Sequence, residues 1–309
     1  MADPIAALRE NIASVFLGNP AAVDRVIRTM LARGHLLIED VPGVGKTVLA
    51  SAIARSVQGE FSRVQMTPDL LPSDIIGVSI FERDTGEFVF KRGPVFANVV
   101  LADEINRTTP RTQTALLEAM SEATVSVDGV SYALPRPFMV IATQNPYEFE
   151  GTYLLPENQL DRFLMRSRLG YPEPATELRV LQSRPARNAL PTLEPVMDLD
   201  TLSELQSRVD AVTVDDRILE YVIAIARATR ASPDLRLGLS PRGSLALTQV
   251  ARATAMIAGR DYVIPEDVLE NVPYVCAHRI IVRGAMEQAD GGEAEAILEQ
   301  LLQTVEAPT

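Results

Sequence analysis

The amino-acid sequence predicts an α/β fold, in which helices cover both faces of a mostly parallel sheet, followed by a smaller all-helical domain. Three observations lead to this prediction. Short apolar runs alternate with helical patterns through the first half of the 309-residue chain, which is typical of βα units. Several of these runs are continuously apolar, as expected for strands buried on both faces. After Pro172 the strand patterns give way to helical periodicity.

The elements of the first half follow from the apolar runs and the residues beside them. The N-terminus is predicted as an amphipathic helix. The predicted buried strands are residues 35–39, 62–66, 98–103, 138–143 and 166–170. Helices are predicted near residues 21–33, 46–58 and 110–123. The last of these has Thr109 as a cap and Pro110 at its first position, which are favourable residues for a helix start.

Two segments interrupt the alternation and are predicted as insertions. Residues 74–92 contain two alternating strands around a turn, and residues 124–136 pair two strands around an Asp-Gly turn. The predicted domains are an α/β core over 1–183, a Pro-rich linker over 184–196, and a helical domain with an acidic C-terminal tail over 197–309. The predicted helices of the second domain are residues 199–210, 215–231, 241–258 and 265–276.

Composition excludes several classes of protein. The net charge of −12 argues against broad nucleic-acid binding, which needs a basic surface. The single cysteine, Cys276, rules out an internal disulfide and a thiolate metal cluster. No apolar run is long enough to span a membrane. The N-terminus lacks the basic and apolar segments of a secretory signal, so we expect a cytoplasmic protein.

The stretch EDVPGVGKT, residues 39–47, is close to the phosphate-binding pattern G-x-x-x-x-G-K-[ST]. It follows a predicted strand and opens a predicted helix, the context in which backbone N–H groups bind phosphate. Asp40 stands where the first glycine is expected, and aspartate tolerates the unusual backbone angles of turns. The alternative is a plain strand–turn–helix junction. The predicted phosphate-binding residues are Asp40, Val41, Pro42, Gly43, Val44, Gly45, Lys46, Thr47 and Val48.

Polar side chains follow two further predicted strands. Asp103 and Glu104 are adjacent, so period-two geometry points them to opposite sides and favours different roles. Asp103 would support Mg²⁺ together with the Thr47 hydroxyl, and Glu104 would polarise the attacking water as general base. Asn145 would orient that water, because an amide both donates and accepts. The alternatives are a solvated acidic strand end and a polar strand cap.

Arginines form two further candidate positions. Arg162, Arg166 and Arg168 cluster before the last predicted strand, where one could stabilise transition-state charge in a neighbouring subunit as an arginine finger. The others would pair with acidic neighbours. Arg242 lies in the first turn of a helix capped by Ser240, where a cation is unfavourable unless an anion binds there. Arg242 is therefore predicted to contact the γ-phosphate.

In this order the motifs resemble those of AAA+ ATPases, and the residues within several of them resemble the MoxR family in particular. EDVPGVGKT resembles the loop sequence that is typical of that family, including the acidic residue before Val41. Residues 102–122, ADEINRTTPRTQTALLEAMSE, resemble the Walker B strand and the helix that follows. ATQNP resembles sensor 1, LPENQLDRFLM the arginine-finger region, and LSPRG sensor 2. The resemblance covers about residues 10–283.

The resemblance implies an AAA+ core with a helical lid, ATP and Mg²⁺ bound at the cleft between them, Arg162 as the finger in trans and Arg242 acting in cis. It also implies a homo-oligomer, as a hexameric ring, that uses ATP turnover to remodel or mature a client protein or complex. Two further expectations rest on the resemblance alone. One is a partner with a von Willebrand factor A domain, and the other is a preference for ATP over other nucleotides. In related ATPases, elements similar to the two insertions tend to face the ring axis.

Two other functions share these motifs. One is a nucleotide-gated switch with little turnover, against which the Asp103-Glu104 pair argues, because a pure switch needs no placed base. The other is the motor subunit of a chelatase-like metal-insertion complex. A kinase is less favoured, since the acidic pair and the C-terminal arginine have no clear role in one.

Overall fold

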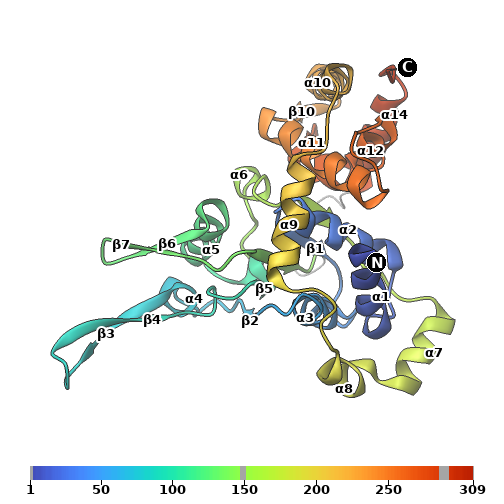
Figure 1. The fold of residues 1–309 in the computed structure, drawn as a ribbon. Helices are drawn as coiled ribbons and strands as arrows, with labels where there is room; N and C mark the ends of the chain where they lie inside the picture. Colours follow the sequence, from blue (N-terminus) through green and yellow to red (C-terminus); the bar gives the residue numbers. More distant parts are fainter. Residues whose placement is uncertain (1–2, 147–150, 285–291, 309) are drawn as a thin grey trace. The chain divides into compact units, whose positions relative to one another are not determined.

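The computed structural model describes residues 3–146, 151–284 and 292–308 (Figure 1). The chain divides into two compact units. The first unit comprises Met1–Asp24, His35–Leu155 and Arg168–Ser203, and the second comprises Arg25–Gly34, Pro156–Ser167 and Glu204–Thr309. The domain boundaries at residues 183 and 197 stay a prediction from the sequence.

The central sheet has five strands in the order β2-β5-β8-β1-β9. The strands are β1 (Leu36–Glu39), β2 (Phe61–Gln65), β5 (Val99–Asp103), β8 (Met139–Gln144) and β9 (Met165–Ser167). The pairs β2–β5, β5–β8 and β1–β8 are all parallel. Each strand overlaps a predicted apolar run, so the α/β prediction is confirmed. Parallel pairing brings the carboxyl ends of β1, β5 and β8 to one edge, where α/β proteins bind ligands.

Helices α1, α3 and α5 of the first unit each bury one face. Leu49, Ala50 and Ile53 of α3 are fully buried. The Thr109 side chain caps α5 by accepting from Thr112 N, as predicted. The helices are α1 (Pro4–Val15), α3 (Lys46–Ser56), α4 (Pro72–Ile76), η1 (Ile105–Arg107), α5 (Pro110–Glu122), α7 (Pro174–Ser183), α8 (Pro185–Asn188) and η2 (Leu190–Thr192). Helix α2 (Pro20–Leu31) has residues in both units.

The two predicted insertions form hairpins. They are β3 (Gly77–Glu82) with β4 (Glu87–Arg92), and β6 (Thr124–Val127) with β7 (Val130–Ala133). Asp128 and Gly129 both have positive φ, as the predicted two-residue turn requires. Both hairpins extend from the sheet in the same direction (Figure 1). They meet where Phe90 stacks on Tyr132, with 4.1 Å between ring centroids.

The segment predicted as a linker lies along α3. Val196 N donates to Ser56 O at 3.0 Å, and Arg55 Nη1 donates to Pro191 O at 3.2 Å. Pro185 begins α8, and Pro191 lies in the first turn of η2. Proline lacks an N–H, which costs nothing in a first turn because the N–H groups there have no partner within the helix. These residues are therefore part of the first unit and are held to α3 by hydrogen bonds that involve their backbone atoms.

The second unit is mostly helical, as predicted. Its elements are α6 (Glu157–Leu160), α9 (Leu199–Asp210, which begins in the first unit), α10 (Asp216–Ala231), β10 (Leu235–Leu237), α11 (Pro241–Ile257), α12 (Pro265–Leu269), α13 (Val272–Cys276), η3 (Ala277–Arg279), β11 (Ile281–Val282) and α14 (Gly292–Leu302). The prediction of one helix over 265–276 is wrong. Pro273 has no N–H to continue α12, so the chain starts a new helix there. In the residues described, no helix is long and apolar enough to cross a membrane.

Candidate functional site

The predicted phosphate-binding loop joins β1 to α3 in the first unit. Gly43 and Gly45 have φ of 89° and 94°, a left-handed conformation that glycine adopts without strain. No atom lies within 4 Å of a Cβ placed on Gly43, so its backbone angle, rather than the space around it, favours glycine. Helix α3 begins at Lys46, directly after this turn. The free N–H groups of a helix's first turn favour an anion at this position.

Asp40 has a structural use that explains its place in the loop. Its Oδ2 accepts from Leu169 N and from Gly170 N, both at 2.7 Å, and its Oδ1 accepts from Val41 N at 2.9 Å. The buried carboxylate therefore holds the start of the loop to the chain after β9. A glycine could not do this, and no local pattern in the sequence indicates the partner residues.

Lys46 lies over the loop with its charge close to three carboxylates. Its Nζ donates to Asp40 O at 2.6 Å. Partial burial lowers the pKa of Lys46, while Asp40, Asp103 and Glu104 act in the opposite direction. The lysine therefore lies near Asp103 and Glu104, the two carboxylates predicted to support Mg²⁺ and to act as general base.

A fully buried threonine links the Asp103 carboxylate to the backbone of Glu104 at the end of β5. The Thr143 hydroxyl donates to Asp103 Oδ1 at 2.7 Å and accepts from Glu104 N at 2.9 Å. Glu104 itself has φ of 61°, a left-handed conformation that is uncommon outside glycine. This turn of the backbone sends the two carboxylates to different surroundings.

The end of β2 supplies partners for both carboxylates. Arg63 Nη2 lies 2.6 Å from Asp103 Oδ2, and Gln65 Nε2 donates to Glu104 Oε2 at 2.7 Å. Arg107 Nη1 lies 3.4 Å from the same Glu104 oxygen. Arg63 and Gln65 were missed by the sequence reasoning. The only sequence pattern that marks Arg63 and Gln65 is the alternation of polar residues in β2, and this pattern does not indicate which strand pairs with β2.

The donor set fits Mg²⁺ held together with a nucleotide. Asp103 and Thr47 offer oxygen atoms, and magnesium in nucleotide sites takes one or two protein oxygens with phosphates and waters. In the described residues, no three His, Cys, Asp or Glu side chains gather as a metal cage, and such a site does not need one. Asn145 follows β8 at the same edge of the sheet and is half-buried. The loop, Asp103, Glu104 and Asn145 thus come together in the first unit.

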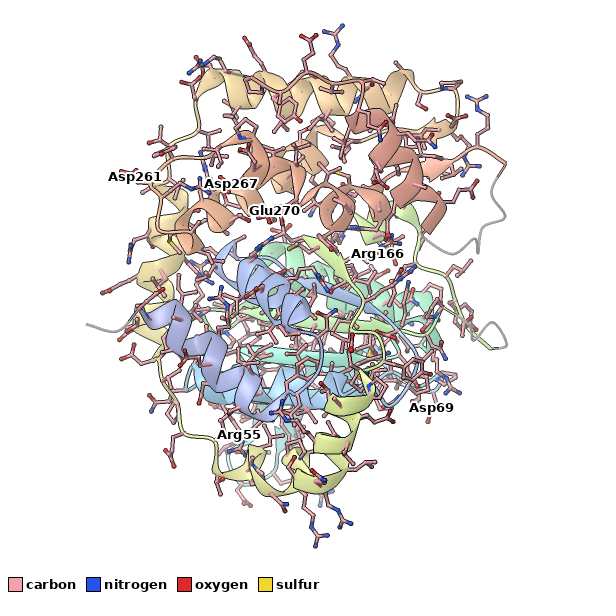
Figure 2. All side chains as sticks on the ribbon, turned by 90° about the vertical axis from the view of Figure 1, so that its right-hand side faces the viewer. Arg55, Asp69, Arg166, Asp261, Asp267 and Glu270 are labelled. Carbon is pink, nitrogen blue, oxygen red and sulfur yellow. The ribbon has the colours of Figure 1, made fainter. Side chains whose placement is uncertain are left out.

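The arginine candidates have distinct surroundings. Arg166, labelled in Figure 2, is buried in β9 and its Nη2 lies 3.1 Å from Glu295 Oε1 of α14. Arg166 therefore pairs with an acidic residue, which was the alternative to a role as arginine finger. Arg162 follows α6 and is half-buried, whereas Arg168 is exposed in the first unit. Arg242 is exposed in the first turn of α11, where Ser240 caps the helix as predicted. Arg162 and Arg242 belong to the second unit.

Comparison with known proteins gives the class that this fold and site define. Residues 35–165 match the family described as ATPases associated with various cellular activities, and residues 227–301 match the AAA lid domain. The crystal structure of a candidate ATPase from Cytophaga hutchinsonii superposes with a TM-score of 0.90 at 35% identity, covering 99% of this chain and 95% of that one. The protein has the AAA+ fold, with an α/β domain and a helical lid domain.

Relatives of known sequence narrow the class. The chain is 41% identical to Chaperone MoxR1 of Mycobacterium tuberculosis, over 95% of this chain and 80% of that protein. It is 31% identical to Protein MoxR of Methylorubrum extorquens, over 99% and 96%. It is 48% identical to YeaC of Bacillus subtilis, a protein described as uncharacterized, over 97% and 93%. The chain belongs to the MoxR family of AAA+ ATPases.

Proposed function

We propose that this protein binds Mg-ATP and hydrolyses it as a homo-oligomer, a hexameric ring, in order to remodel or mature a client protein or complex. The chaperone name of the Mycobacterium tuberculosis relative supports the client. The hexamer and a partner with a von Willebrand factor A domain rest on the family resemblance. The cytoplasmic location rests on the N-terminal sequence.

The roles of the residues follow from their surroundings. Residues 40–48 would bind the phosphates through backbone N–H groups and Lys46. Thr47 and Asp103 would hold Mg²⁺, which would neutralise charge on the phosphates. Glu104 would take the proton of the attacking water, and Asn145 would orient that water. Arg162 in trans and Arg242 in cis would stabilise charge on the γ-phosphate.

One observation carries the proposal. Thr143 fixes Asp103 and the backbone of Glu104 at once, so that the two adjacent carboxylates face different partners near Lys46. Hydrolysis needs this separation, since the metal-supporting carboxylate and the base have different tasks. A protein that only binds nucleotide would not need the second carboxylate directed to different partners from the first.

A switch with little turnover is favoured by another observation. Arg63 contacts Asp103, and Gln65 and Arg107 contact Glu104, so both carboxylates have protein partners in this structure. Such contacts would suit a resting state. The chelatase-like alternative is less supported. The magnesium-chelatase subunit of Nicotiana tabacum is 28% identical over 63% of this chain and 45% of that protein.

The test is the ATPase rate per subunit, measured across a range of protein concentration, for the wild type and for Glu104→Gln. Glutamine keeps the shape of the side chain and removes the base. We expect a wild-type rate per subunit that rises with concentration, because a neighbouring subunit completes each site. In Glu104→Gln, turnover should fall by about 100-fold or more while binding of a fluorescent ATP analogue is retained.

The other outcomes separate the alternatives. A rate that does not depend on concentration would refute a site completed in trans. A negligible wild-type rate with tight ATP binding would favour the switch. Wild-type turnover in Glu104→Gln would show that another group acts as the base.

A further inference from the structure

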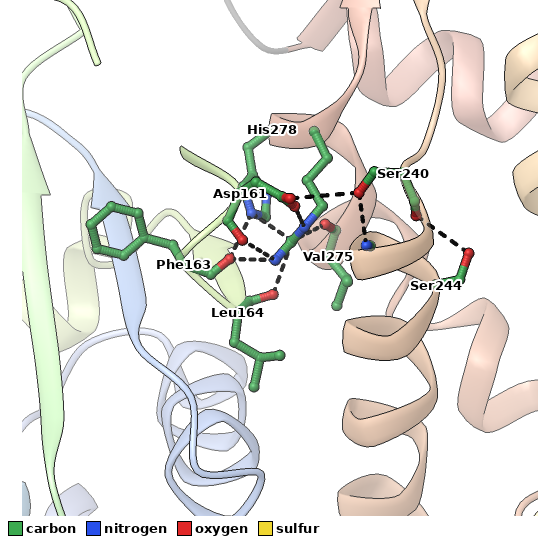
Figure 3. A network of polar contacts seen from close by, with 9 residues as sticks. Asp161, Phe163, Leu164, Ser240, Ser244, Val275 and His278 are labelled. Atoms are coloured by element: carbon green, nitrogen blue, oxygen red, sulfur yellow. Dashed lines mark hydrogen bonds and ion pairs between the residues drawn. The ribbon is translucent and has the colours of Figure 1, made fainter. Parts of the chain in front are cut away.

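Arg279 of η3 makes most of its hydrogen bonds to a short segment that it does not adjoin in sequence. Its Nε donates to Asp161 Oδ1 at 2.7 Å, its Nη2 to Phe163 O at 2.6 Å and to Asp161 O at 3.3 Å, and its Nη1 to Leu164 O at 3.2 Å (Figure 3). Nη1 also donates to Val275 O in the preceding helix. One guanidinium thus binds the carboxylate and the backbone of residues 161–164.

Arg162 lies inside this segment, between two residues that Arg279 holds. The carbonyls of Asp161 and Phe163 both accept from Arg279 Nη2. His278 adds a further contact, with its Nε2 3.0 Å from Phe163 O. The backbone on each side of Arg162 is therefore fixed to η3, while the Arg162 side chain stays half-buried at the surface.

Burial makes this arrangement specific. The Arg279 side chain is only 2% exposed and that of Asp161 is 20% exposed. A buried guanidinium must have its donors satisfied, and the planar fork of arginine matches several acceptors at once. Burial lowers the pKa of Arg279, and Asp161 acts in the opposite direction. A lysine in its place would keep the charge but lose the fork.

The neighbouring helix α11 does not need this arginine for its own start. Ser240 Oγ accepts from Gly243 N at 3.1 Å, which caps the helix within its own first turn. Ser240 Oγ is 3.5 Å from Asp161 Oδ2, a weak contact. Loss of Arg279 would therefore act on the 161–164 segment more than on the turn that carries Arg242.

We propose that Asp161 and Arg279 are positioning residues for Arg162, and that they hold the turn from which Arg162 reaches the nucleotide of a neighbouring subunit. This inference rests on the proposed function. The pair acts through the backbone of residues 161–163 and touches no substrate. Its loss should therefore resemble loss of Arg162 itself.

The test uses the full chain with Arg279→Lys and Asp161→Asn beside Arg162→Ala. We expect the ATPase rate to fall by about 100-fold, since a displacement of about 1 Å at a catalytic group has an effect of that size. Affinity for a fluorescent ATP analogue should change by less than about twofold, because the phosphate-binding loop is intact. Each variant is then mixed with Glu104→Gln subunits, which lack the base and retain Arg162.

The matched control is Arg260→Lys. Arg260 forms a buried ion pair with Asp267 in the same unit, through two hydrogen bonds of 2.6 and 2.7 Å to the carboxylate, and the Asp267 side chain (labelled in Figure 2) is 4% exposed. This pair holds the Tyr262 carbonyl and Ile264 N. Arg260→Lys should lower the melting temperature as Arg279→Lys does and leave the ATPase rate and ATP affinity close to wild type.

The mixtures distinguish a positioning role from a structural one. If the pair places Arg162 for a neighbour, Glu104→Gln subunits will restore hydrolysis by Arg279→Lys and Asp161→Asn subunits, as they do for Arg162→Ala. If only Arg162→Ala is restored, the inference is wrong and the proposed function stands. If Arg162→Ala is fully active or is not restored, the trans role of Arg162 fails and the inference with it. Should Arg279→Lys not fold, Asp161→Asn decides by the same criteria.

Discussion

Replacement of Asp40 by alanine should destabilise the first unit strongly. The change removes the acceptor of Leu169 N and Gly170 N, of which the first is buried. The buried amide of Leu169, left without a partner, costs about 1–3 kcal/mol, and the amide of exposed Gly170 adds less because water can reach it. Folded domains are typically stable by only about 5–15 kcal/mol, so this loss is substantial. Asp40→Asn keeps one acceptor oxygen and should cost less.

The assay combines urea denaturation with hydrogen exchange. The amides of residues 169 and 170 should exchange faster in Asp40→Ala, because their acceptor is gone, and the free energy of unfolding should fall. Asp215→Ala is the control, since this carboxylate accepts from Arg217 N at an exposed cap of α10 and its loss should cost about 1 kcal/mol. Unchanged exchange at 169 and 170, with a wild-type urea midpoint, would refute the reasoning.

Three further predictions follow from single side chains. Arg63→Gln frees Asp103 Oδ2 to bind Mg²⁺. The Mg²⁺ concentration that gives half-maximal binding of a fluorescent ATP analogue should therefore fall by about two- to fivefold, a modest effect because Arg63 is half exposed. An unchanged Mg²⁺ concentration at half-maximal binding would contradict this prediction. Burial lowers the pKa of His35 to about 4 and that of His278 well below its usual value, so the unfolded chain takes up protons first on acidification. The free energy of unfolding should therefore decrease from about pH 6.5 to about pH 4, by about 3 kcal/mol for His35, and equal urea midpoints at those pH values would contradict this. Burial raises the pKa of the Cys276 thiol to about 12, so a disulfide reagent should label it only after unfolding, and rapid labelling of the native protein would disprove this.

Several elements were predictable because their causes lie within a few residues. The strands before the loop and before Asp103 are continuous apolar runs, and the observed β1 and β5 lie within them. Thr109 and Ser240 cap the helices that follow them, because a capping side chain bonds an N–H only three residues ahead. The Asp128-Gly129 turn is set by two backbone angles. The error at residues 265–276 came from extending one helical pattern through Pro273.

The roles of the candidate site residues remain predictions, but their surroundings are now described. The sequence placed Asp103 and Glu104 at a strand end and favoured different roles for them. It did not indicate that Thr143 links the Asp103 carboxylate to the Glu104 backbone. Nor did it indicate that Arg63 and Gln65 reach the two carboxylates from β2. These contacts depend on which strand lies beside β5 and in what register, with Gln65 opposite Asp103. The residue pattern of a single strand does not indicate the order of strands in the sheet.

By itself the sequence determined the alternating α/β core, the glycine-containing loop between β1 and α3 and the helical second half, since local periodicity and turn chemistry decide these. Only the tertiary structure decided what Asp40 does and what holds Arg162. The Asp40 carboxylate accepts hydrogen bonds from the backbone of Leu169 and Gly170, about 130 residues away in the chain. Arg279 donates to Asp161, from which it is separated by 118 positions in the chain. Such contacts form because folding buries polar groups that must then find partners, and the partner is whichever segment the packing brings near.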